Sequence, residues 1–404
     1  MRHWTEFGVR HGPVMSARTH VGQVPELAFL IDPAIEANAA ALAEPLRGLT
    51  NDGTVRPGLI PLRSTGVPTA PILEAALAFA QQIGPQRLAQ MTFPIESPAW
   101  RTWFNVHMNF YRHGVMLEDL DPAGRDAFCG LMRATLSARG FHQARDIMRL
   151  NGLLGEVTGS VDEFGEWPYF VSFFGTPSAA APWGWQLDGH HLAVNCVVVG
   201  DELVLTPTFM GSEPCHASSG PLAGIRVMDV EQRVGLDLIR SLDAPQRAEA
   251  VQYSSIMPDA IPRHLQHFID GRMQAGAFKD NVTLPYLGVC ADAFNDAQRG
   301  LLRDTIGTYV GWANDRHAAV RMRDVDAHLD ETWFSWMGGT GPTDPFYYRV
   351  HSPVVFVEFD HHPGVAFENP EPTHHHIHSI VRTPNGGDYG ADLLAQHHER
   401  YAHG

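Results

Sequence analysis

The sequence predicts an α+β protein: a mostly antiparallel mixed sheet flanked by helices, with histidine-rich strands lining one site. Residues 191–209 and 346–382 are rich in β-branched and aromatic residues, whereas 121–154 and 229–253 have helical patterns. Helical pairs placed between runs of strands are typical of α+β proteins. The first strand run is interrupted by Gly200-Asp201, a short turn of the kind that joins antiparallel neighbours.

Length and composition indicate how the chain is divided. A chain of 404 residues with 44% hydrophobic and 18% charged residues can bury a large core and is typical of a globular protein. Residues 1–70, rich in proline and glycine, are expected to form a loop-rich N-terminal segment. Because the strand-rich segments are expected to share one sheet, residues 71–404 are predicted to form a single large α+β domain.

Capping and turn residues mark several boundaries. Asp121 before Pro122 is a strong helix start, because Asp caps the first turn and proline tolerates its first position. Gly140 ends that helix, and Asn385-Gly386-Gly387 makes a turn before the last one. The expected helices are 34–49, 71–83, 121–140, 141–154, 229–242, 245–253, 292–314 and 389–399, and the expected strands are 191–199, 202–209, 346–350, 354–359 and 374–382, with 99–111 extended.

Charge and cysteine content narrow the classes of partner. The net charge is −16, with no basic block, which argues against nucleic acid and anionic membranes as partners. No apolar run reaches the roughly 18 residues that span a bilayer, and no signal peptide is recognised. Four scattered cysteines argue against a disulfide scaffold and fit a cytoplasmic protein, with a periplasmic location as the alternative. We expect a small-molecule substrate and a possible homo-oligomer.

Two histidine clusters are the strongest indication of function. In a strand, successive side chains alternate between faces, so His374, His376 and His378 share one face and His375 points the other way. A row of imidazoles on one face is typical of a transition-metal site. His376 and His378 are therefore the first predicted ligands of a divalent metal ion, either zinc or iron.

The second cluster is His190-His191, about 180 residues upstream. Read as strand residues, the two point to opposite faces, so one enters the metal site and the other supports it from behind. We favour His191, which shares its face with Asn195, but the residues leave the choice between His190 and His191 open. The competing interpretation is that both are core histidines that donate to backbone carbonyls.

Charged residues on the last strands supply candidate catalytic groups. Glu358 and Asp360 lie on one face of an otherwise apolar strand, where burial is costly unless a cation or hydrogen bonds compensate. If this strand pairs with 374–382, the carboxylates and histidines face one space. Arg382 shares that face and suits clamping an anionic substrate group, although an ion pair with Asp388 or Asp392 is an equal alternative.

Several short motifs occur together along the chain. They are Trp183-Gly184-Trp185, Gly189-His190-His191-Leu192, Thr206-Pro207-Thr208-Phe209, Tyr347-Tyr348-Arg349, Glu358-Phe359-Asp360, His376-Ile377-His378 and Asp388-Tyr389-Gly390-Ala391-Asp392-Leu393-Leu394. In order and spacing, over about residues 100–400, this set resembles the domain of unknown function 3500 family. The resemblance implies that the family's polar motif positions are His190, His191, Glu358, Asp360, His376 and His378. The chain departs from the family at His361-His362-Pro363, where amide-bearing residues are usual.

The leading functional hypothesis is a metal-dependent hydrolase that acts on a small molecule through a metal-activated water. Glu358 would be a fourth ligand or the general base, and Asp360 is the alternative carboxylate. The runner-up is a non-heme iron(II) oxygenase that uses the same histidine and carboxylate site. A third hypothesis, from another class, is a non-catalytic metal-binding protein.

Overall fold

One large sheet organises the protein. The structure, a computed structural model, describes residues 4–10, 18, 28–107, 111–267 and 269–401. Within these ranges the strands follow the order β1-β3-β4-β5-β7-β13-β12-β11-β10-β8, with β2, β6 and β9 paired to β3, β5 and β10. Two pairs, β1 with β3 and β8 with β10, are parallel, and the others are antiparallel. The predicted α+β class and mixed sheet are confirmed.

The elements have the following bounds. The strands are β1 Thr92–Phe93, β2 Val115–Met116, β3 Phe170–Phe174, β4 Trp183–Gly189, β5 Leu192–Val199, β6 Glu202–Val204, β7 Thr208–Ser212, β8 Val251–Tyr253, β9 Val289–Cys290, β10 Trp333–Gly338, β11 Phe346–His351, β12 Phe356–His362 and β13 Thr373–Arg382. The helices are α1 Ala28–Ala43, α2 Ala70–Met91, α3 Pro122–Thr135, α4 Ala138–Thr158, α5 Asp229–Ser241, α6 Ala244–Ala250, α7 Asp296–Val310, α8 Asp315–Ala327 and α9 Ala391–Tyr401.

Local capping explains where the helices begin. The Asp121 carboxylate accepts a hydrogen bond from the Gly124 N–H at 2.7 Å, and α3 starts there as predicted. Helix α7 starts at Asp296, four residues later than expected, because Asn295 and Gln298 form a reciprocal capping box. The extended conformation expected for 99–111 is wrong at its start. Residues Pro98–Thr102 form a 3₁₀ turn that is capped by Ser97.

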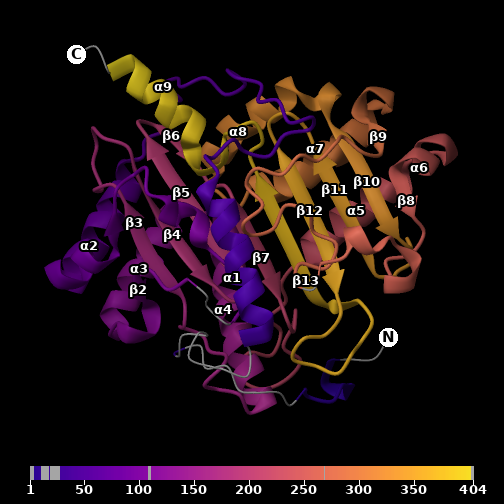
Figure 1. Ribbon diagram of the computed structural model, residues 1–404, viewed down its shortest axis with the longest axis horizontal. Coiled ribbons are helices and arrows are strands. Elements are labelled where there is room, and N and C mark those ends of the chain that lie inside the picture. The colour runs from indigo at the N-terminus through magenta and orange to yellow at the C-terminus, as the bar shows by residue number, and fades with distance from the viewer. Residues whose placement is uncertain (1–3, 11–17, 19–27, 108–110, 268, 402–404) are drawn as a thin grey trace.

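The sheet has two different faces (Figure 1). On one face α3, α4, α5 and α7 cover a large apolar core that includes Phe128, Leu238 and Ile306. On the other face, α1 crosses in front of the central strands in Figure 1, and a second core gathers residues such as Trp103 and Ile380. None of the described helices combines the length and the apolar character needed to cross a membrane.

The central pair β12–β13 presents its polar side chains on the second face. Phe359 belongs to the helix-covered core, so its neighbours in sequence point the other way. Asp360 is paired directly with His378, and directly opposed residues share a face. Irregular chain from residues 269–284 packs over this face. The sheet thus buries a group of charged and imidazole side chains beneath a loop.

Candidate metal centre

Three imidazoles converge on one point. The Nε2 atoms of His376 and His378 lie 3.1 Å apart, and the Nε2 atom of His191 lies 3.1 Å from that of His376. Ligand nitrogens about 2.1 Å from a shared ion and 3.1 Å apart subtend an angle of roughly 95°. All three residues are buried, and their ligand atoms lie within 4.8 Å of one another. The expected convergence of His376 and His378 with one histidine of the 190–191 pair is present, with His191 as the upstream member, and the group could hold a metal ion.

His191 reaches this point from a hairpin turn and not, as predicted, from a strand. Gly189 of β4 pairs with Leu192 of β5, so His190 and His191 form the two-residue loop. His191 has φ = 60°, a left-handed conformation that is uncommon outside glycine. Its N–H donates to the Asn105 carbonyl at 3.0 Å, and its own carbonyl accepts from the Gly211 N–H at 2.8 Å. A strained backbone held from both sides is typical of a functional position.

His190 packs behind His191. The two rings stack with centroids 3.9 Å apart. The Nδ1 atom of His190 lies 2.7 Å from the Asn151 side-chain oxygen, and its carbonyl accepts from the Tyr169 hydroxyl at 2.9 Å. His190 therefore supports the ring of His191 from behind, which is the role expected for the histidine of the pair that does not enter the site. The structure does not bring His190 into the group of three.

Hydrogen bonding and burial set the orientation and the protonation state of the clustered imidazoles. His376 Nδ1 lies 2.7 Å from the Pro363 carbonyl, an oxygen that can only accept. The proton is thereby fixed on Nδ1 and the Nε2 lone pair is directed to the shared point. Burial, together with the neighbouring imidazoles, lowers the pKa of His191 and of His378 well below the usual range, so both rings are neutral at pH 7. Buried His378 Nδ1 has no hydrogen-bond partner among the described residues.

A bulge separates His374 from His376 and His378 on β13. His361 pairs with Ile377, but the next residue, His362, pairs with Thr373, so β13 gains residues at this point. The alternation expected from His374 to His378 is interrupted. The two ring nitrogens of His374 instead contact the Gln232 side chain and the Asp344 carbonyl.

The Glu358 carboxylate lies on the expected face but is fully occupied by other donors. It accepts from the N–H groups of Gln274 and Ala275 at 2.8 and 2.9 Å and from the Tyr347 hydroxyl at 2.6 Å. Burial raises its pKa, and these donors oppose that rise. Glu358 thus anchors the loop that covers the sheet, and it does not belong to the metal-capable group.

Asp360 has a comparable role. It accepts from Arg272 Nε at 2.6 Å and from the Arg272 N–H at 3.0 Å. Burial raises its pKa, and the Arg272 guanidinium acts in the opposite direction. Gly271, with φ = +61°, lies so close that a Cβ atom there would come within 2.4 Å of Asp360 Oδ2. Asp360 therefore holds the loop tightly against the sheet.

Arg382 lies at the other end of β13 and is completely buried. Its Nη1 atom donates to Asp280 and Asp388, each at 2.9 Å, and its Nε donates to the Ala275 carbonyl at 2.7 Å. Of the two roles expected for Arg382, the geometry supports the ion pair with Asp388. Six residues of extended strand separate it from His376, roughly 20 Å, so the structure does not bring it to the histidines.

His362 is a neighbour of the cluster that was not predicted as a site residue. Its ring centroid lies 3.9 Å from that of His378, and its Nε2 atom lies 3.0 Å from Asp360 Oδ2. The sequence signal was present, because His362 shares the alternation of Glu358 and Asp360. It places a fourth imidazole against the group of three and links that group to the carboxylate that holds the loop.

Comparison with known protein families locates this site within a family. The family described as "Protein of unknown function (DUF3500)" matches residues 65–391, which include all three histidines. The chain belongs to the DUF3500 family. The resemblance seen in the sequence motifs is therefore confirmed. Searches of curated proteins and of solved structures find no match.

Proposed function

We propose that this DUF3500 protein is an enzyme that holds one divalent metal ion on His191, His376 and His378 and hydrolyses a small-molecule substrate. The observation that carries the proposal is the convergence of three buried imidazoles: the Nε2 atom of His376 lies 3.1 Å from those of His191 and His378, and the ligand atoms all lie within 4.8 Å of one another. Three histidines with a further position left for water or substrate are the ligand set of an open catalytic zinc site. A cation there would lower the pKa of a coordinated water and supply hydroxide at neutral pH.

The chain's own residues have distinct tasks in this proposal. His376 keeps its lone pair directed inward through its contact with Pro363, and the strained turn fixes the ring of His191. Because Glu358 and Asp360 are occupied by loop donors, neither is proposed as a ligand. The described metal-capable group contains no carboxylate, which favours zinc hydrolysis over an iron site of two histidines and one carboxylate.

An iron(II) oxygenase is the second candidate. The roughly 95° angle implied by the 3.1 Å spacing is closer to the 90° of an octahedral site than to the tetrahedral angle. A three-nitrogen face on an octahedral ion would leave positions for both dioxygen and substrate. A metal-binding protein without turnover uses the same ligands, and the absence of any turnover would identify it.

Metal analysis tests the site. Protein produced without a histidine tag and purified without chelators should contain about one equivalent of zinc or iron per chain. His376→Ala, His378→Ala and His191→Ala should each lose it, because removing one of three ligands leaves an incomplete site. His375→Ala is the matched control, since its ring contacts Phe7 and His216, away from the cluster. Equal losses in all four variants, or no metal in the wild type, would contradict the proposal.

Turnover then separates the two chemistries. Zinc-loaded protein should hydrolyse members of a panel of carboxylic esters, amides and phosphoesters, and the His376→Ala variant should not. Iron-loaded protein should instead consume dioxygen in the presence of a substrate if the second candidate is correct. Bound metal with neither activity would support the non-catalytic alternative.

A further inference from the structure

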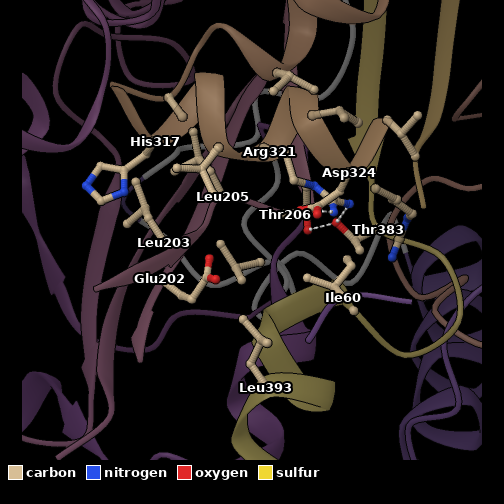
Figure 2. Close-up of a pocket in the computed structure, with 18 of the residues that line it drawn as sticks. Ile60, Glu202, Leu203, Leu205, Thr206, His317, Arg321, Asp324, Thr383 and Leu393 are labelled. Carbon is tan, nitrogen blue, oxygen red and sulfur yellow. Dashed lines mark hydrogen bonds and ion pairs between the residues drawn. The ribbon is translucent and has the colours of Figure 1, made fainter. Parts of the chain in front are cut away.

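A cavity lies at the opposite end of β13 from the histidines. Its volume is about 50 Å³, and it is lined by β6, the residues between β6 and β7, α8, the start of α9 and the end of β13. Figure 2 shows the Thr206 and Thr383 side chains meeting at one side of it, where their hydroxyls are 2.8 Å apart. Arg382 also lines it, so the cavity is separated from His376 by the length of β13.

The cavity has apolar walls beside charged residues, and the Glu202 carboxylate faces into it. In Figure 2 the side chains of Ile60, Leu203, Leu205 and Leu393 surround the space. Apolar walls favour the hydrocarbon part of a ligand. A carboxylate among them is costly unless a partner compensates its charge.

Glu202 has an ion-pair partner, Arg63, but no hydrogen-bond donor to its Oε1 atom among the described residues. It is only 6% exposed, and its buried Oε1 atom makes no hydrogen bond there. Arg63 Nε approaches to 3.5 Å, but the Arg63 Nη2 donates to both Asp324 oxygens at 2.7 and 3.0 Å. Burial raises the pKa of Glu202 to about 7, with the Arg63 charge opposing the rise. The buried Glu202 carboxylate therefore faces the cavity with an oxygen atom that can accept a hydrogen bond from a ligand.

The surrounding charges favour a positively charged donor. Glu202, Asp324 and Asp392 line the cavity together with Arg321 and Arg382. Arg63 lies outside the lining and pairs with Glu202 and Asp324. Arg321 Nη2 contacts the Val354 carbonyl and the Thr383 hydroxyl, and its Nη1 lies 3.7 Å from Asp324. Arg382 is already paired with Asp280 and Asp388. The remaining three carboxylates face two guanidinium groups, so an added cation is attracted and an added anion is repelled.

We propose that this cavity binds a small primary ammonium ion whose short alkyl chain packs on the apolar walls and whose ammonium group donates to Glu202. One water position needs about 10–15 Å³ of such volume, so about 50 Å³ accommodates a ligand of roughly three to five heavy atoms. This inference is independent of the metal centre and of the proposed hydrolysis.

Titration calorimetry of the full-length protein with n-butylammonium chloride tests the proposal. Sodium butyrate and n-butanol, which have the same chain length with an anionic or neutral head, are the matched probes. Butylammonium should bind at one site per chain, and the other two should bind at least tenfold more weakly. No binding of butylammonium, or equal binding of butyrate or butanol, would overturn the proposal.

Two variants locate the binding. Glu202→Gln keeps the shape but removes the charge, and the affinity for butylammonium should fall about tenfold to a hundredfold, as expected for a hydrogen bond to a charged group. Leu205→Phe fills the cavity without changing its charge and should have a similar effect. Glu156→Gln, an exposed position on α4, is the control and should bind like the wild type. Wild-type affinity in both cavity variants would show that butylammonium binds elsewhere.

Discussion

Replacing Glu358 by glutamine should destabilise the protein and leave its metal in place. Glutamine has nearly the shape of glutamate but offers one oxygen and one NH₂ group. The three donors at 2.6–2.9 Å, from Tyr347, Gln274 and Ala275, cannot all be satisfied. Losing a hydrogen bond to a charged acceptor costs about 1.5–3 kcal/mol, and an unpaired buried donor costs about 1–3 kcal/mol. Removing a buried charge offsets part of this cost.

The net loss should be about 2–4 kcal/mol. Unfolding entropy of about 2.1 cal/mol/K per residue gives roughly 0.85 kcal/mol/K for 404 residues, so the melting temperature should fall by about 2–5 °C. Differential scanning calorimetry measures the shift. Glu156→Gln, which changes the same functional group at an exposed position of α4, should shift it by less than about 1 °C.

The opposite pattern would refute this reasoning. If Glu358→Gln melts like the wild type and retains its metal while turnover falls by roughly two to four orders of magnitude, Glu358 is the general base expected from the sequence. A loss of metal at unchanged melting temperature would instead make it a ligand.

Three further predictions concern other residues. His191→Gly and His191→Ala should both lose the metal, but the glycine variant should be more stable by about 1 kcal/mol in thermal unfolding, because φ = 60° suits glycine. Arg382→Met leaves the buried carboxylates of Asp280 and Asp388 without their cation and should cost about 3–5 kcal/mol in chemical denaturation. Burial raises the pKa of Asp188 to about 8, so the folded state retains a proton that the unfolded chain releases near pH 4. Wild-type stability should therefore fall by up to about 1.4 kcal/mol per pH unit between these values, and melting curves of Asp188→Asn at pH 5 and 8 should lack that fall.

The pairing of the last two strands could be predicted because its signals are local. Alternation placed His376 and His378 on one face and assigned Glu358 and Asp360 to the same side, and the register of β12 with β13 confirms both. Arg382 also lies on that face as expected. Each of these inferences needs only the two-residue period of a strand.

What could not be predicted depends on contacts distant in sequence. The sequence does not show that Arg272 will pair with Asp360, or that the N–H groups after Arg272 will donate to Glu358. The loop that carries these donors has no periodic pattern from which its position could be predicted. The hairpin turn at His190-His191 was missed because histidine is an unusual residue for a left-handed turn position, where glycine or asparagine is the usual signal. The bulge that separates His374 from His376 and His378 also has no recognisable signal in the sequence.

The lengths of the outermost strands bear on how copies of this chain can associate. Among the described residues the sheet ends in β1, with two residues, and β8, with three. An edge this short exposes few unpaired backbone groups, which protects a large sheet against edge-to-edge aggregation. A homo-oligomer of this protein therefore cannot rely on extending the sheet from one copy to the next, and its interface would have to be built from side chains of the helices and loops.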